Sequence, residues 1–137
     1  FMMFKDNYIL GVGIGNYSAR YQEYVERYPE LNVGHDFYSA HNSFLKIMAE
    51  TGTLGIIAYL FIYLGLFYQL TKYYLFFRKK ECSLSKVLLM GFMAGSVAYL
   101  LQNNTNNLIF IPQQNIIFWM FAALILNYVH KEKEYLI

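Results

Sequence analysis

One short stretch of this chain gathers side chains that could do chemistry at the edge of a membrane. His41 and Asn42 stand where a helix is expected to begin, and residues 43–51 have the apolar spacing of a short amphipathic helix. Gly52 and Gly55 follow and are expected to form a hinge into a long apolar run. Polar and ionisable groups beside a membrane helix are costly, so they usually mark function.

His41 has the chemistry of a general base. The N-terminal end of a helix disfavours an imidazolium and attracts anions, and a neutral imidazole can accept a proton from a hydroxyl. The alternative is that His41 only caps or anchors the helix. On the same helix Asn42, Lys46 and Glu50 recur at i, i+4 and i+8, which predicts a polar stripe on which Lys46 and Glu50 can pair.

A glycine-rich segment precedes this stretch. Its spacing is not that of a dinucleotide-binding fingerprint, because the third glycine comes one residue too early and no strand–helix–strand unit surrounds it. The glycines are expected to adopt positive φ and to let the backbone approach another element or a ligand closely. A plain flexible turn is the alternative. The candidate substrate-binding residues of this segment are Gly11, Gly13, Gly15 and Asn16.

Residues 17–28 predict a helix that Pro29 ends, with Ser18 as a possible cap. Its apolar face is formed by Tyr21, Tyr24, Val25 and Tyr28.

Two arginines on this helix are candidate substrate-binding residues. Arg20 and Arg27 are each within pairing distance of Glu23 along the helix, which is typical of a solvated, salt-bridged face. The functional interpretation is that a guanidinium fork faces the oxygens of a diphosphate.

No metal or other cofactor is predicted. His35, Asp36, His41 and Glu50 could be imagined as ligands, but their spacing matches no standard zinc pattern. His35 and Asp36 are interpreted as ordinary loop residues. Cys82 is the only cysteine, so a disulfide within the chain is excluded.

Composition indicates a membrane protein. The chain has 137 residues, of which 57% are hydrophobic and 15% are charged, against about a quarter charged in ordinary soluble domains. The net charge is +2, and no basic stripe interleaved with aromatic residues is present, which argues against a nucleic-acid partner.

Three apolar runs predict transmembrane helices, at residues 53–77, 87–103 and 112–129. Basic residues follow the first and third runs, which predicts that these ends and the C-terminus are cytoplasmic and that the His41 loop is extracytoplasmic. Within the second run, Gly91 and Gly95 predict close helix packing. The amide-rich residues 102–107 are interpreted as a solvated turn.

The expected fold is therefore an all-α integral membrane helical bundle with three transmembrane helices. Residues 1–52 form an extracytoplasmic loop segment that carries short helices, and residues 53–137 form the transmembrane segment.

Three motifs, taken in order and with their spacing, resemble the O-antigen ligase and O-antigen polymerase superfamily of membrane glycosyltransferases. His41 is followed eleven residues later by Gly52, as in that family. The motifs are Gly11-x-Gly13-x-Gly15-Asn16-Tyr17, His41-Asn42-x-Phe44-Leu45 and Glu50-x-Gly52-x-x-Gly55.

The resemblance implies the C-terminal part of a longer multi-pass protein of the bacterial inner membrane. Such a protein transfers or polymerises glycan from an undecaprenyl-diphosphate carrier to an acceptor glycan during O-antigen, capsule or exopolysaccharide synthesis. His41 would be the base, Asn42 would orient the base or the acceptor, and upstream transmembrane helices would hold part of the site. Whether the reaction is polymerisation or ligation stays open.

Two other interpretations compete with an enzyme. One is a non-enzymatic membrane protein such as a fragment of a transporter or flippase, which would be expected to keep polar groups within its spans. The polar groups of this chain lie outside the spans, which favours the enzyme. The other is an inactive gene remnant.

Overall fold

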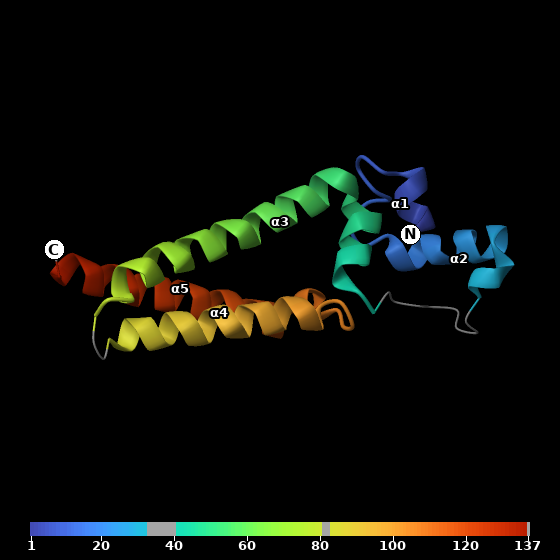
Figure 1. The fold of residues 1–137 in the computed structure, drawn as a ribbon. Helices are drawn as coiled ribbons and strands as arrows, with labels where there is room; N and C mark the ends of the chain where they lie inside the picture. Colours follow the sequence, from blue (N-terminus) through green and yellow to red (C-terminus); the bar gives the residue numbers. More distant parts are fainter. Residues whose placement is uncertain (33–40, 81–82, 137) are drawn as a thin grey trace. The chain divides into compact units, whose positions relative to one another are not determined.

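The computed structural model describes residues 1–32, 41–80 and 83–136 (Figure 1). Throughout these ranges the regular structure is helical, as the sequence predicts. The helices are α1 (Met2–Asp6), α2 (Tyr17–Arg27), α3 (Ser43–Phe77), α4 (Leu84–Gln102) and α5 (Pro112–Tyr135), with 3-10 turns at Pro29–Leu31 and Leu108–Phe110.

The chain divides into two compact units. The first comprises Phe1–Leu60 and Asn103–Asn107, and the second comprises Phe61–Gln102 and Leu108–Ile137. Helix α3 contributes its first part to the first unit and its remainder to the second. The candidate site residues all belong to the first unit.

The core of the first unit forms where α2 lies against α1 and the first part of α3. The predicted apolar face of α2 is confirmed, because Tyr21 and Tyr24 are buried together with Met3 and Ala49. Tyrosine suits this position because its ring fills the core while its hydroxyl can reach a polar partner.

Helix α2 begins two residues earlier than a cap at Ser18 would require. Asn16 occupies the N-cap position and Ser18 lies inside the first turn, so the predicted capping role of Ser18 is wrong. The helix ends at Arg27, and Pro29 opens the 3-10 turn that follows. Proline suits the start of a turn because its missing N–H would have no partner there.

In the second unit, aromatic side chains pack α3, α4 and α5 together. Phe118 of α5 stacks on Tyr99 of α4 with ring centroids 4.5 Å apart, and it lies 5.9 Å from Tyr63 of α3. Leu70 and Leu89 are fully buried in the same unit.

Two of the described helices, α3 and α4, are long and apolar enough to cross a membrane. Most residues of their apolar stretches are not buried within the chain, which suits helices that face lipid or further helices. The predicted third span corresponds to α5, which does not pass the same test. Gln113, Gln114 and Asn127 lower its hydropathy, and the third span stays a prediction.

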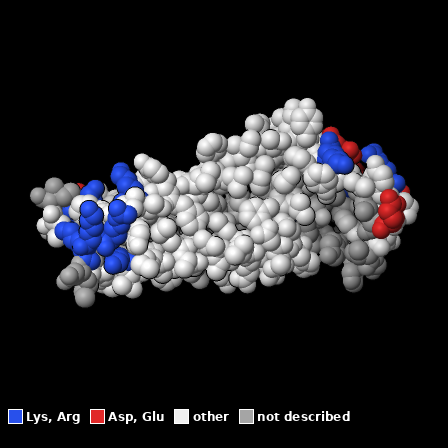
Figure 2. Space-filling model, viewed as in Figure 1, with Lys and Arg blue, Asp and Glu red and all other residues white. Residues whose placement is uncertain are grey.

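Charged side chains in the second unit gather where α3 ends, α4 begins and α5 ends (Figure 2). No Asp, Glu, Lys or Arg occurs between Lys86 and Lys131 along the chain. The basic side chains of this region are Arg78, Lys79, Lys80, Lys86, Lys131 and Lys133.

Gly91 and Gly95 do not bring helices together in this chain. A Cβ added to either glycine would meet no described atom within 4 Å, so the predicted close helix packing is wrong for the described residues. Both glycines instead line a hollow of about 280 Å³ with Tyr99 and Phe118.

Candidate functional site

Helix α3 is broken at Gly52, and the N-terminal segment fills the break. Gly52 has φ 64° and ψ −160°, and α3 changes direction there (Figure 1). A helix break leaves carbonyl groups on one side and N–H groups on the other without helical partners. Residues 8–13 supply these partners.

Four backbone hydrogen bonds join the segment to the break. Val12 and Gly13 donate to the carbonyls of Ala49 and Glu50 at 2.8 and 2.9 Å. On the far side, Thr53 donates its N–H to the carbonyl of Tyr8 at 2.7 Å. The fourth bond runs from the N–H of Leu54 to the carbonyl of Ile9 at 3.4 Å.

Gly11 and Gly52 are both required by this close approach. Each has positive φ, and a Cβ on Gly11 would overlap the backbone of Glu50. A Cβ on Gly52 would overlap the backbone of Ile9. The expectation that the glycine-rich segment uses positive φ to approach another element closely is thus confirmed at Gly11, and that element is the break in α3.

The other glycines of the motifs have different surroundings. Gly13 and Gly15 also have positive φ, but Gly15 has open space around it. Gly55 lies inside the helix, where its missing side chain leaves room for Thr51. Asn16 donates from its side-chain amide to the carbonyl of Val12 at 3.1 Å, which holds the loop closed ahead of α2.

Glu50 opens the third motif, but the sequence did not reveal its structural role. The expected polar stripe places it toward solvent, but it is only 3% exposed. Its Oε1 accepts a hydrogen bond from the backbone N–H of Tyr17 at 3.3 Å, at the first residue of α2. A carboxylate satisfies and stabilises the positive end of a helix, so Glu50 ties the start of α2 to the break in α3.

The start of α3 is built by Asn42, Ser43 and the chain that follows α4. Asn42 accepts the N–H of Leu45 at 3.0 Å and so caps the helix. Ser43 is fully buried; its backbone N–H donates to the carbonyl of Asn103, and its hydroxyl donates to the side-chain oxygen of Asn103, both at 2.8 Å.

Asn103 is itself fully buried, so the interpretation of residues 102–107 as a solvated turn is wrong at this position. His41 directly precedes the cap and is exposed. The structure therefore presents an imidazole at the surface, on a helix start that two buried side chains hold in place.

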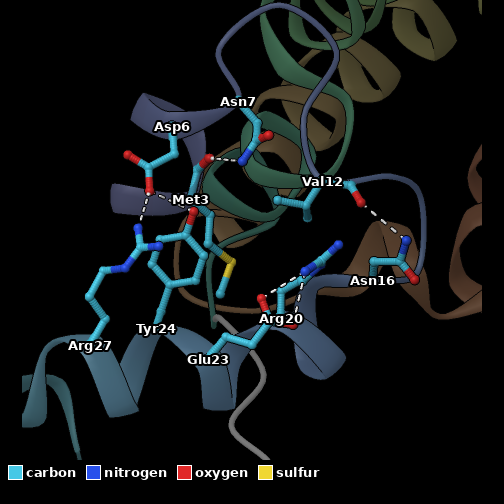
Figure 3. A network of polar contacts seen from close by, with 9 residues as sticks. All are labelled: Met3, Asp6, Asn7, Val12, Asn16, Arg20, Glu23, Tyr24 and Arg27. Atoms are coloured by element: carbon cyan, nitrogen blue, oxygen red, sulfur yellow. Dashed lines mark hydrogen bonds and ion pairs between the residues drawn. The ribbon is translucent and has the colours of Figure 1, made fainter.

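A pocket of about 570 Å³ lies between α1, the glycine-rich loop and α2 (Figure 3). Three of the predicted substrate-binding residues, Gly11, Arg20 and Arg27, meet on its wall. The other described lining residues are Asp6, Asn7, Val12, Glu23 and Tyr24. Neither His41 nor Asn42 is among the described residues of this wall.

Each arginine of the pocket is paired with a carboxylate. Nη1 of Arg20 donates to both oxygens of Glu23, at 2.8 and 2.7 Å. Nη1 of Arg27 donates to Oδ2 of Asp6 at 3.2 Å, and the hydroxyl of Tyr24 donates to the same oxygen at 2.8 Å (Figure 3). The salt-bridged face expected on α2 is present at Arg20 and Glu23, whereas Arg27 reaches across to α1.

These contacts shift two pKa values. The hydrogen bond and charge of Glu23 raise the pKa of Arg20 above its ordinary value. Burial raises the pKa of Tyr24, and the hydrogen bond to Asp6 and its charge raise it further. The stability that Tyr24 contributes through its protonated hydroxyl is therefore fully present at neutral pH and is lost only as the pH rises through this raised pKa.

Within the part of the chain that the structure describes, no group of three His, Cys, Asp or Glu side chains could hold a metal ion. His35 and Asp36, which were considered as ligands, lie outside the described residues, as does Cys82.

The family described as O-antigen ligase matches residues 1–60, a range that contains the glycine-rich loop, His41 and the break at Gly52. The chain is also 30% identical over 128 residues to the teichuronic acid biosynthesis protein TuaE of Bacillus subtilis (strain 168). That alignment covers 93% of this chain and 24% of TuaE, so the chain spans about a quarter of the relative that it matches. No solved structure matches the chain.

The resemblance predicted from the sequence motifs is therefore confirmed, because residues 1–60 match the O-antigen ligase family and the relative TuaE is 30% identical to the chain. The match to the family lies on the helical unit that carries His41 and the paired arginines.

Proposed function

We propose that this chain is the C-terminal part of a multi-pass glycosyltransferase of the bacterial inner membrane that builds a surface polysaccharide. The observation that carries the proposal is the O-antigen ligase match over residues 1–60, where His41 stands exposed on a fixed helix start. The relative named for teichuronic acid biosynthesis supports a role in surface glycan assembly.

The proposed reaction moves glycan from an undecaprenyl-diphosphate carrier to the hydroxyl of an acceptor glycan. The acceptor oxygen bonds to the anomeric carbon, the bond from that carbon to the phosphate oxygen breaks, and the diphosphate leaves with the bonding electrons. His41 accepts the proton of the acceptor hydroxyl, a role worth about 10²- to 10⁴-fold in rate. Polymerisation and ligation are the same transfer with different acceptors.

The remaining residues have supporting roles in this proposal. Asn42 fixes the helix start that presents His41, and Gly52 sets the direction of α3 beyond it. Gly55, which the sequence also assigned to the hinge, keeps helical geometry and leaves room for Thr51 beside the break. Arg20, Arg27, Gly11, Gly13, Gly15 and Asn16 bind substrate at the pocket and its loop. The family resemblance assigns part of the site to upstream transmembrane helices of the parent chain. It assigns the diphosphate to arginines on the extracytoplasmic loop, upstream of this segment.

Three spans are proposed, formed by the apolar part of α3, by α4 and by α5. The His41 unit then lies on the extracytoplasmic side, and the basic residues around the end of α3 and the C-terminus lie in the cytoplasm.

The test is His41→Ala in the full-length parent protein in its native cell. We expect transferred glycan to fall about 100-fold or more and the lipid-linked precursor to accumulate, while the membrane level of the protein holds. His130→Ala, a histidine of the second unit, is the matched control and should leave glycan output near wild type. Unchanged glycan output in His41→Ala would rule out the general-base role.

A further inference from the structure

The pocket between α1 and α2 has a wall without net charge. Two guanidinium groups and two carboxylates face it, and they form the pairs Arg20–Glu23 and Arg27–Asp6. A diphosphate carries negative charge and only accepts hydrogen bonds, so it would gain little attraction here and would meet both carboxylates.

The same wall offers donors and acceptors side by side. The hydrogen bonds of Asp6 use Oδ2, and no described residue donates to its Oδ1 or to Oδ1 of Asn7. Arg20 and Arg27 each use only Nη1 toward described partners, although a guanidinium has five N–H donors. A hydroxyl group donates and accepts at once, so neighbouring hydroxyls on a sugar ring match this alternation.

Asp6 and Arg27 are also held by contacts with Tyr24. Tyr24 is buried and fixes Oδ2 of Asp6, while the guanidinium of Arg27 lies 5.7 Å from the centre of the Tyr24 ring. Polar groups held in fixed positions bind more tightly because less side-chain freedom is lost on binding. The pocket volume of about 570 Å³ is typical of a site for a small ligand.

We infer that this pocket binds the sugar hydroxyls of the glycan, and that the diphosphate is held elsewhere. The inference rests on the proposed function for the identity of the glycan, but the pocket's chemistry stands on its own. Asp6, Asn7 and Glu23 accept hydrogen bonds from sugar hydroxyls, and Arg20 and Arg27 donate to the hydroxyl and ring oxygens.

The experiment compares two probes on the full-length protein in lipid nanodiscs. The first is the oligosaccharide released by mild acid from the cell's own surface glycan, which lacks diphosphate. The second is inorganic pyrophosphate. Binding is measured by calorimetry on wild type, on the near-isosteric variants Glu23→Gln and Asp6→Asn, and on Glu26→Gln, an exposed carboxylate of α2 that is not among the lining residues.

We expect wild type to bind the oligosaccharide, and we expect the pocket variants to leave pyrophosphate binding unchanged, because the diphosphate is held elsewhere in the full-length protein. Glu23→Gln and Asp6→Asn should each weaken oligosaccharide binding about tenfold, because each removes a charged acceptor, and Glu26→Gln should not. If the pocket were an anion site, removal of a carboxylate would free an arginine, and the same variants would bind pyrophosphate more tightly than wild type. Tighter binding of pyrophosphate by these variants would overturn the inference. The inference would also fail if both substitutions left the oligosaccharide affinity unchanged, or if wild type bound no oligosaccharide.

The catalytic role of His41 and the assignment of the pocket can each be contradicted without the other. His41→Ala should keep oligosaccharide binding, because His41 is not among the described residues of the pocket wall. If His41→Ala leaves glycan output intact while the pocket variants still lose oligosaccharide binding, the proposed catalytic role fails and the pocket assignment stands.

Discussion

Glu50 shows how a single carboxylate can join two helices whose starts are far apart in the sequence. Its backbone carbonyl accepts from Gly13, and its side chain accepts from the N–H of Tyr17. Because the side chain is buried, its removal takes the carboxylate partner away from the backbone N–H of Tyr17 in the first turn of α2. The pocket depends on this contact, since α2 carries both of its arginines.

Glu50→Ala should therefore loosen α2 without touching His41. A hydrogen bond to a charged group is worth about 1.5–3 kcal/mol, so amide hydrogen exchange in the first turns of α2 should quicken roughly 10- to 100-fold. Mass spectrometry of exchanged peptides from the full-length protein measures this. Glu26→Ala, at an exposed position on α2, serves as the control, and equal exchange in the two variants would contradict the assigned role of Glu50.

At the level of elements, the break in α3 and the glycine-rich loop form one structure. The loop gives the break its missing hydrogen-bond partners, and the break gives the loop its fixed path. Gly11 and Gly52 face each other across this contact, so each is needed for the same reason.

Substitution of these glycines should separate steric overlap from backbone strain. Gly15→Ala meets only the strain of positive φ, which costs about 1–2 kcal/mol, because the space around Gly15 is open. Gly11→Ala and Gly52→Ala add overlap with backbone atoms, which cannot move aside easily, and should cost at least about 3 kcal/mol.

Thermal-shift midpoints and membrane levels of the full-length protein should fall clearly in Gly11→Ala and Gly52→Ala and only slightly in Gly15→Ala. The double variant should be close to the worse single variant, because both substitutions disrupt one contact. Additive losses would mean that the loop and the break are independent.

The elements themselves could be predicted from the sequence, whereas their contacts could not. The tyrosine spacing predicts α2, and the apolar runs predict α4 and the long part of α3, because periodicity and hydropathy are local properties. The buried Glu50 has its partner Tyr17 33 residues away, and the buried Asn103 has its partner Ser43 60 residues away. Contacts at such distances along the chain leave no periodic signal in the sequence. For the candidate site, spacing along one helix placed Arg20 beside Glu23, but the partner of Arg27 comes from α1.

At the scale of the whole molecule, the charge pattern predicts the orientation of the chain in the membrane. Basic residues follow α3 and lie in the last turns of α5, and a cytoplasmic position of such residues is the usual rule. Ala19 on α2 and Lys79 after α3 are both exposed and suit a labelling test.

In a full-length protein whose native cysteines, Cys82 among them, are replaced by serine, Ala19→Cys should react with a membrane-impermeant maleimide in intact cells. Lys79→Cys should react only after the membrane is permeabilised. Glycan output of both variants serves as the control for native insertion. Labelling of both positions in intact cells would contradict the proposed orientation.

The filled break in α3 also bears on how deep the site can sit in the bilayer. An interrupted helix normally cannot enter the hydrocarbon region, because its unpaired carbonyl and N–H groups would lose water without replacement. Residues 8–13 replace that water with protein hydrogen bonds, so Gly52 is free to lie at the level of the lipid headgroups or slightly below them. The diphosphate of the carrier in the proposed reaction is anchored at that same level, so this carrier would not have to leave the membrane to reach the start of α3.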